Sequence, residues 1–349
     1  MSQRRLVFAS SLDYARHTGG YVYNTRLMQE LAARGWDVVP LDLPAGFPRP
    51  DAAARARSAT LLAELPDGSL VVADQICLSP LADLLAHEAA RLRIVMIFHH
   101  PIAMKEGLPS GERARFMTAE RAALAACRLV VATSLTTAET LRRDYGVPAE
   151  RIVVALPGIE RFAAAEPLPT DVLRLLSVGA VIPRKGYHDL IEALAGLADL
   201  PWTLGIVGDH ERAPDYVAKL TGMIRDAGLE GRVVPRGGIA SAELDAEWRS
   251  AHVYVAASLH EGYGMAVAEA IARGLPTVTT GADAVRGWLD PTAALIVPER
   301  SPEALRAALA RVLSEPALRA ELRAAALAQA ARLPSWSDAA EAVDRRLAA

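Results

Sequence analysis

Cysteine is scarce in this chain, with two residues among 349. Cys77 and Cys127 both lie within apolar segments. We therefore expect buried free thiols in a reducing compartment, and neither a disulfide framework nor a cysteine-based metal site. Apolar runs are also short, and none approaches the roughly 18 residues that a membrane-spanning helix needs. These absences favour a soluble, cytoplasmic protein.

An excess of charge of one sign is missing as well. The 38 lysines and arginines nearly balance the 41 aspartates and glutamates, which gives a net charge of -3. Without a polybasic surface, nucleic acid is not an expected partner. Residues 112–128 hold four arginines but also two glutamates, so we interpret this segment as a solvated helix face and do not favour membrane association. Nothing in the pattern indicates an oligomeric state.

Several motifs that would identify a chemistry are absent. No G-x-G-x-x-G follows a predicted strand, and the sequence contains no G-x-x-x-x-G-K-[ST] and no G-x-S-x-G. Dinucleotide binding of the usual kind, P-loop chemistry and the common hydrolase elbow are therefore not expected. Asp-x-Asp is absent too, so the usual carboxylate clamp for a metal-bound nucleotide diphosphate is missing, and we predict no metal site and no cofactor.

What the chain does have is an alternation of apolar runs with helical patterns, which is typical of parallel sheets covered by helices. Three prolines and a glycine interrupt it between Leu156 and Thr170, and the alternation then restarts. We predict an α/β protein with two doubly wound, Rossmann-like domains and a cleft between them. The expected boundaries are residues 1–163 for the first domain, 164–334 for the second and 335–349 for a carboxyl-terminal helix.

The most informative stretch is HVYVAASLHEGYGMAVAEAIARGLPTVTT, from His252 to Thr280. We predict a buried strand, a glycine-rich loop, a helix over residues 265–273 and a second strand. The free amides at such a helix start favour a phosphate group. Two carboxylates flank this site, and they are suited to accept hydrogen bonds from sugar hydroxyls. The candidate ligand-binding residues of this stretch are Glu261, Gly262, Tyr263, Gly264, Met265 and Glu269.

Three further loops follow predicted strands, where ligands of such sheets bind. Gly19 and Gly20 immediately precede a predicted helix and would expose its amides, although an ordinary flexible loop with a helix-starting glycine is the preferred interpretation of this pair taken alone. Arg184 and Lys185 stand just before another helix, where two cations oppose the helix dipole unless an anion joins them. His99 and His100 follow a buried strand, and at most one of them faces a ligand; a structural, hydrogen-bonded histidine is the simpler alternative.

These segments together resemble glycosyltransferase family 4, the retaining enzymes with the GT-B fold. The resemblance rests on SLHEGYGMAVAEAIARGLPTV, GAVIPRKGYHDLIEAL and the TGG loop, and it extends over nearly the whole chain. It implies that Glu261 lies beside the donor sugar, with the amides of residues 262–265. It further implies that Glu269 holds the nucleotide ribose and that Arg184 and Lys185 bind the diphosphate.

The same resemblance implies that Gly20 approaches the donor from the first domain and that His99, or else His100, faces the donor sugar. The segment VVPRGGIASAEL would line the base pocket, with Arg236 or Ile239 near the ring. Residues 336–347 would form a helix that crosses back over the first domain. Where the family often has Cys-Gly after the glutamate helix, this chain has Arg273-Gly274, which we interpret as a packing difference.

The expected activity is transfer of a hexose from a UDP- or GDP-linked sugar to an acceptor hydroxyl, on a small molecule, a glycan or a lipid-linked acceptor. We expect retention of the anomeric configuration by same-face attack and no requirement for a metal. A nucleotide-sugar epimerase of the same fold is the alternative enzyme. A nucleotide-sugar-binding protein without activity is a third interpretation, which the presence of both glutamates and both cations disfavours.

Overall fold

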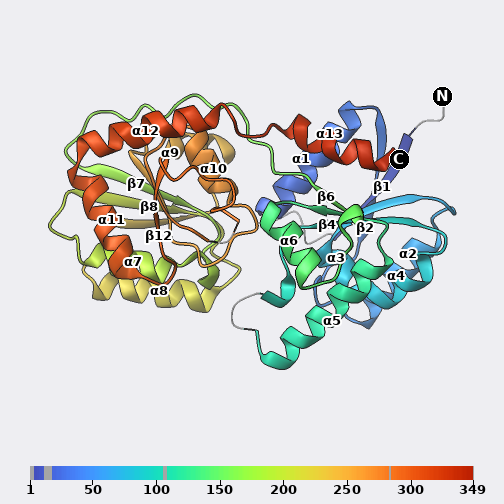
Figure 1. Ribbon diagram of the computed structural model, residues 1–349. Coiled ribbons are helices and arrows are strands. Elements are labelled where there is room, and N and C mark those ends of the chain that lie inside the picture. The colour runs from blue at the N-terminus through green and yellow to red at the C-terminus, as the bar shows by residue number, and fades with distance from the viewer. Residues whose placement is uncertain (1–3, 12–17, 105–107, 283, 349) are drawn as a thin grey trace. The chain divides into compact units, whose positions relative to one another are not determined.

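The computed structural model describes residues 4–11, 18–104, 108–282 and 284–348. The chain divides into two compact units, coloured by residue number in Figure 1. Unit 1 comprises residues 1–158 together with 334–349, and unit 2 comprises residues 159–333. The chain therefore leaves unit 1 once and returns to it near its end. The predicted fold class, α/β with two doubly wound units, is confirmed.

Unit 1 is built on a six-stranded parallel sheet with the order β2-β1-β3-β4-β5-β6. Its strands are β1 (Arg4–Ser11), β2 (Trp36–Leu43), β3 (Leu70–Asp74), β4 (Arg93–Phe98), β5 (Leu129–Ala132) and β6 (Ile152–Val154). Its helices are α1 (Gly19–Ala33), α2 (Ala52–Ala63), α3 (Gln75–Leu78), α4 (Ala82–Glu88), α5 (Ser110–Ala126), α6 (Leu135–Arg143) and α13 (Trp336–Leu347), with 3-10 turns η2 (Ser79–Leu81), η3 (Ile102–Met104) and η4 (Ala149–Arg151). All five residues of β3 are buried, as expected for a strand covered on both faces.

The carboxyl-terminal helix α13 packs within unit 1, against α1. Its Trp336 ring meets the ring of Tyr23 edge-on, with centroids 5.8 Å apart. Near its other end, the carboxylate of Asp344 accepts hydrogen bonds from Arg4 and from the Trp36 indole, both at 2.8 Å. These contacts join the last helix to the first two strands of the chain, so residues distant in sequence build one core.

Unit 2 repeats the design with the order β12-β11-β10-β7-β8-β9, again fully parallel. Its strands are β7 (Leu173–Val178), β8 (Trp202–Val207), β9 (Val233–Gly237), β10 (Val253–Ala256), β11 (Thr277–Thr280) and β12 (Ala294–Val297). Its helices are α7 (Tyr187–Ala195), α8 (Pro214–Asp226), α9 (Ser241–Ser250), α10 (Met265–Ala272), α11 (Pro302–Ser314) and α12 (Pro316–Ala330), with the 3-10 turn η5 (Pro183–Lys185).

The strand order of each sheet reverses at one point, and ligands of open α/β sheets bind beyond the carboxyl ends of the strands at that point. In unit 2 the reversal lies between β7 and β10, and in unit 1 it lies between β1 and β3. The strand order alone thus brings together the loops after β7 and β10. Among the residues that the structure describes, no helix combines the length and the apolar character that crossing a bilayer requires.

Candidate functional site

Two loops of unit 2 meet at the reversal point, one after β7 and one after β10. The amide of Leu259 donates to the carbonyl oxygen of Arg184 at 2.8 Å, which ties the two loops together. Gly186 makes this approach possible: its φ is +63°, and an added Cβ would lie 1.9 Å from the carbonyl oxygen of Ala257. Only glycine tolerates both the backbone angle and the contact. The loop that carries Arg184 and Lys185 is therefore held against the loop that carries Glu261.

The carboxylate of Glu261 is the centre of this site. Lys185 Nζ lies 2.6 Å from Oε1, and Ser258 Oγ donates to the same oxygen at 2.6 Å. Arg184 Nη1 lies 3.5 Å from Oε2 and donates to the backbone carbonyl of His260 at 2.6 Å. The structure thus brings together three of the residues predicted to be functional, and it pairs the acid directly with both cations.

Burial and charge act in opposite directions on Glu261, which is 9% exposed. Burial raises the pKa of the carboxyl, but Lys185 and Arg184 outweigh burial and bring the pKa down to about 2. The group is therefore ionised at every physiological pH. The loop that carries Ser258 and Glu261 is held further by Thr280 at the end of β11, whose hydroxyl donates to the carbonyl of Ser258.

Lys185, Ser258 and Glu261 line one small cavity of about 10 Å³. A space of that size holds about one water molecule, so a sugar does not fit inside it. The charged side chains of Lys185 and Glu261 nevertheless face the same small cavity.

The EGYGM loop leads into α10, whose first residue is Met265. Gly264 caps this helix with a φ of +90°, a backbone angle that favours glycine. The first-turn amides of such a helix have no partner within the helix. Tyr263 packs inside the unit, where its ring stacks on Trp288 with centroids 5.2 Å apart, and the Trp288 indole donates to its carbonyl at 2.8 Å. The Tyr263 hydroxyl is buried without a hydrogen-bond partner among the described residues.

Glu269 is half-buried on α10, one helical turn before Arg273. Burial raises the pKa of Glu269 to about 7, with the charge of Arg273 acting in the opposite direction. Arg273 itself is 4% exposed; its guanidinium pairs with Asp245 at 2.9 Å and lies 3.9 Å from the ring centroid of Phe162. The interpretation of Arg273 as a packing difference alone was therefore incomplete, because its charge keeps down the pKa of the second predicted glutamate.

Arg236 and Ile239 were predicted to lie near a nucleotide base. Arg236 lies within β9, and it pairs with Glu247 of α9 at 2.8 Å. Ile239 packs at the edge of the hydrophobic cluster that includes Trp248. The ion pair of Arg236 thus lies with α9, and Ile239 packs against the hydrophobic cluster of unit 2.

In unit 1, the glycine pair lies inside a helix and not before one. Helix α1 begins at Gly19 because the Thr18 side chain caps it, accepting from the amide of Tyr21 at 3.2 Å. The predicted start at Tyr21 was therefore two residues late. Gly19 and Gly20 supply first-turn amides at the carboxyl end of β1, as an anion site requires.

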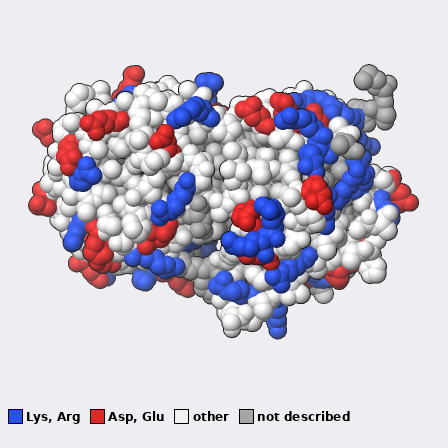
Figure 2. Space-filling model, in the orientation of Figure 1, with Lys and Arg blue, Asp and Glu red and all other residues white. Residues whose placement is uncertain are grey.

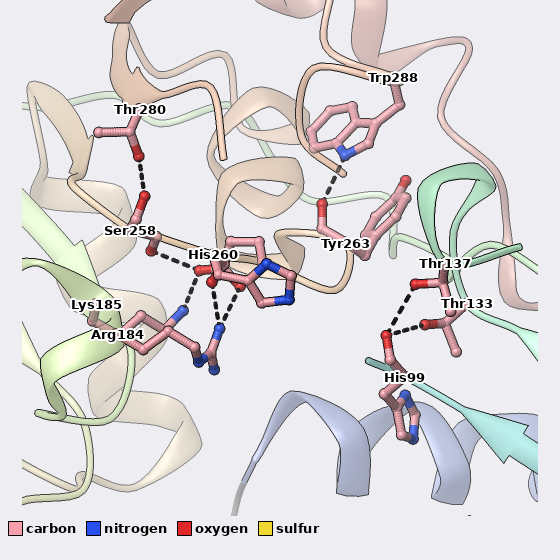
Figure 3. A network of polar contacts seen from close by, with 11 residues as sticks. His99, Thr133, Thr137, Arg184, Lys185, Ser258, His260, Tyr263, Thr280 and Trp288 are labelled. Atoms are coloured by element: carbon pink, nitrogen blue, oxygen red, sulfur yellow. Dashed lines mark hydrogen bonds and ion pairs between the residues drawn. The ribbon is translucent and has the colours of Figure 1, made fainter. Parts of the chain in front are cut away.

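His99 follows β4 and is 9% exposed. Its Nε2 lies 3.1 Å from Oδ1 of Asn24, and its backbone amide donates to Gln75 at 3.1 Å. Its carbonyl accepts from the hydroxyls of Thr133 and Thr137, as Figure 3 shows. Burial lowers the pKa of the imidazole to about 4, and Asp74 offsets this only in part. His99 is therefore a neutral imidazole at neutral pH.

Sequence reasoning missed several residues that hold these groups in place: Asn24, Asp74, Gln75, Ser258 and Thr280. Four of them stand at or just after the carboxyl end of a strand, so a search of every strand end for polar residues finds them. Asn24 lies inside α1 and carries no such signal. Cys77 and Cys127 are both buried free thiols, as predicted. Among the described residues, no three His, Cys, Asp or Glu gather as metal ligands would.

Comparison with protein families matches both halves of the chain. Residues 158–329 match the family described as Glycosyl transferases group 1, and residues 46–161 match Glycosyltransferase Family 4. A D-inositol 3-phosphate glycosyltransferase of Xylanimonas cellulosilytica is 30% identical over 241 residues, which cover 64% of this chain and 57% of that protein. The chain spans less than two thirds of the length of the curated relatives that it matches first.

Two solved structures share the fold along almost their entire length. Sucrose-phosphate synthase from Thermosynechococcus elongatus superposes with a TM-score of 0.83 at 19% identity, covering 98% of each chain. Anabaena HepE in complex with UDP and glucose gives a TM-score of 0.78 at 18% identity, covering 99% of each chain. At such identities the likeness shows the fold alone.

Proposed function

The chain belongs to glycosyltransferase family 4 and has the GT-B fold, and from this premise we propose that it transfers a hexose from a nucleotide diphosphate sugar to an acceptor hydroxyl. The transfer retains the anomeric configuration and needs no metal. The proposed donor is UDP- or GDP-linked. UDP-glucose is the first donor to test, since HepE was solved with UDP and with UDP-glucose.

One observation carries the proposal: Lys185 and Arg184 converge on Glu261 beside the start of α10. A diphosphate that approaches the two cations and the helix amides meets fixed positive charge, which stabilises an anion most where water is excluded. It also competes with Glu261 for the cations. The carboxylate released from Arg184 would then accept hydrogen bonds from sugar hydroxyls, while Ser258 keeps it in place.

In the proposed reaction, the bond between the anomeric carbon and the β-phosphate oxygen breaks, and its electron pair leaves with the nucleoside diphosphate. The acceptor oxygen attacks the same face of the sugar. Its proton passes to the departing phosphate oxygen, so charge and atoms balance without an added base. Lys185, Arg184 and the first amides of α10 offset the charge that develops on the phosphate.

The remaining predicted residues have supporting roles in this proposal. Glu269 would accept hydrogen bonds from the ribose, a role that requires the ionised form and thus a pH near or above its pKa of about 7. His99 would contact the donor sugar as a neutral hydrogen-bonding group, because an imidazole with a pKa of about 4 has only one of its two ring nitrogens protonated at neutral pH. Gly19 and Gly20 would offer backbone amides from α1.

The test is to incubate the purified protein with UDP-glucose, UDP-galactose, UDP-N-acetylglucosamine or GDP-mannose, with and without a panel of sugar, inositol and glycerol acceptors. Nucleotide release that depends on the acceptor, with product that keeps the donor's anomeric configuration, supports transfer. Sugar interconversion without acceptor identifies the epimerase instead. Full activity in EDTA is expected, and loss of activity restored by Mg²⁺ or Mn²⁺ would overturn the metal-free mechanism.

A further inference from the structure

Behind His99 lies a chain of buried hydrogen bonds that the proposed reaction does not yet use. Asn24 of α1 and Asp74 at the end of β3 are each 2% exposed. The amide nitrogen of Asn24 donates to Oδ2 of Asp74 at 3.2 Å, and its amide oxygen lies 3.1 Å from His99 Nε2. The other oxygen of Asp74 accepts from the amide of Cys77 at 3.0 Å and caps α3.

The partners of Asn24 determine its orientation. An aspartate oxygen that accepts from the Asn24 side chain requires the NH₂ group on that side, because an amide oxygen there would face a carboxylate oxygen. The amide oxygen must then face His99, and an amide oxygen only accepts. In a neutral imidazole the nitrogen that meets an acceptor is the one that carries the proton. The proton of His99 is thereby placed on Nε2, and the lone pair on Nδ1.

We propose that Asn24, oriented by Asp74, is a positioning residue that fixes the tautomer and the ring of His99 so that Nδ1 accepts a hydrogen bond from a hydroxyl of the donor sugar. This inference rests on the proposed function for its ligand, but its structural half does not. The backbone of His99 is held independently by Gln75 and by Thr137, so loss of Asn24 releases the ring and leaves the backbone anchored. Edge-on contact with the Tyr23 ring, with centroids 5.3 Å apart, limits the ring further.

The experiment uses the full chain labelled with ¹⁵N-histidine, with His99 assigned by comparison with His99→Gln. Nitrogen shifts report which ring nitrogen carries the proton, with or without substrate. The expected result for the wild type is a single Nε2–H tautomer that persists from pH 8 to pH 5. An Nδ1–H tautomer, or an even mixture of the two, would overturn the proposal.

Two variants test Asn24 and Asp74 separately. Asn24→Leu removes the acceptor and should yield mixed tautomers at His99. Asp74→Asn keeps a good helix cap through its amide oxygen and turns its NH₂ group toward Asn24, so the Asn24 amide should reverse and the proton of His99 should move to Nδ1. In both variants kcat with a saturating donor should fall about tenfold to a hundredfold, the value of one misplaced buried hydrogen bond. Asn24→Leu places an apolar group beside Asp74, so far-ultraviolet circular dichroism checks whether this variant folds. If Asn24→Leu is unfolded, the test rests on Asp74→Asn alone.

The outcomes separate this inference from the proposed function. If no donor is turned over and no nucleotide binds, the proposed function fails, while the nitrogen shifts still decide the tautomer. If transfer occurs and both variants keep the wild-type tautomer and rate, the role of Asn24 and Asp74 is refuted.

Discussion

Each unit places a buried polar cluster beyond its central strands, and the two clusters differ in charge. In unit 2, Glu261 is ionised and pairs with Lys185 and Arg184. In unit 1, His99 is neutral; it donates hydrogen bonds to Asn24 and Gln75 and accepts them from two threonines. The charged cluster contains partners that a diphosphate can replace. The His99 ring is uncharged, although the buried carboxylate of Asp74 lies in the same hydrogen-bond chain, and such a ring is suited to orient an uncharged sugar.

The largest expected effect concerns the charged cluster. Lys185→Ala leaves Glu261 buried with the more distant Arg184 as its remaining cationic partner. Breaking a buried pair in this way costs about 3 kcal/mol or more of unfolding free energy. Lys219→Ala, on the exposed face of α8, removes the same group and should change stability by less than about 0.5 kcal/mol. Urea unfolding at pH 7 measures both variants. Equal stability of the two would show that the Glu261 cluster is not the charged core described.

The low pKa of His99 predicts that the unfolding free energy depends on pH, with a change similar in size to the effect of Lys185→Ala. Because the pKa of His99 is lowered from 6.5 to about 4, the unfolded chain binds the proton first, and stability falls as pH drops through that window, by roughly 3 kcal/mol in total. The depressed pKa of Glu261 acts in a lower window, from 4.5 down to about 2. Urea unfolding of wild type and His99→Gln between pH 7 and 4 isolates the first effect. Parallel curves for the two proteins would mean that His99 titrates normally in the fold.

If Glu269 binds the nucleotide as proposed, Arg273 links charge to that binding in unit 2. Removing its charge in Arg273→Met takes away the influence that opposes burial, so the pKa of Glu269 should rise above its value of about 7, by about one unit or more. Calorimetric binding of UDP, measured from pH 6 to 9, should then show its pH midpoint moved upward. Arg225→Met, an exposed arginine of α8, is the control. An unchanged pH midpoint would show that the charge of Arg273 does not act on the pKa of Glu269.

Ser258→Ala gives the smallest effect, because it removes one hydrogen bond and leaves both cations on Glu261. The expected loss of transition-state stabilisation, measured through kcat/KM, is about 1.5 kcal/mol, the lower end of the range for a hydrogen bond to a charged group. Steady-state kinetics measures it, with Ser250→Ala at the end of α9 as the matched control. A Ser258→Ala variant as active as this control would indicate that Lys185 alone positions Glu261.

Much of the fold could be predicted because its signals are local. Apolar runs such as residues 253–256 identify buried strands, and Gly264 and Gly274 mark where α10 begins and ends. The start of α1 was misplaced because Gly19 and Gly20 suggest a loop, whereas the Thr18 cap makes them helical. Thr18 stands directly before the glycines and is itself a local cap signal, which the prediction gave less weight than the glycine pair.

The sequence allowed the residues of the candidate site to be named, but it did not allow their contacts with one another to be predicted. Arg184, Lys185 and Glu261 each stand after a strand, and the order of the strands brings them together. Their direct pairing joins residues 76 positions apart, which no local pattern records. Asn24 was missed for the same reason: its function is defined by Asp74 and His99, which come from two other strands.

The central claim is that Lys185, paired with Glu261, provides the charge that holds a nucleoside diphosphate on unit 2. Isothermal titration calorimetry with UDP and GDP tests it directly on wild type, Lys185→Ala and Lys219→Ala, each confirmed as folded. The account predicts that at least one of the two nucleotides binds wild type and Lys219→Ala equally and binds Lys185→Ala at least about thirtyfold more weakly. Equal affinity in all three proteins would contradict it.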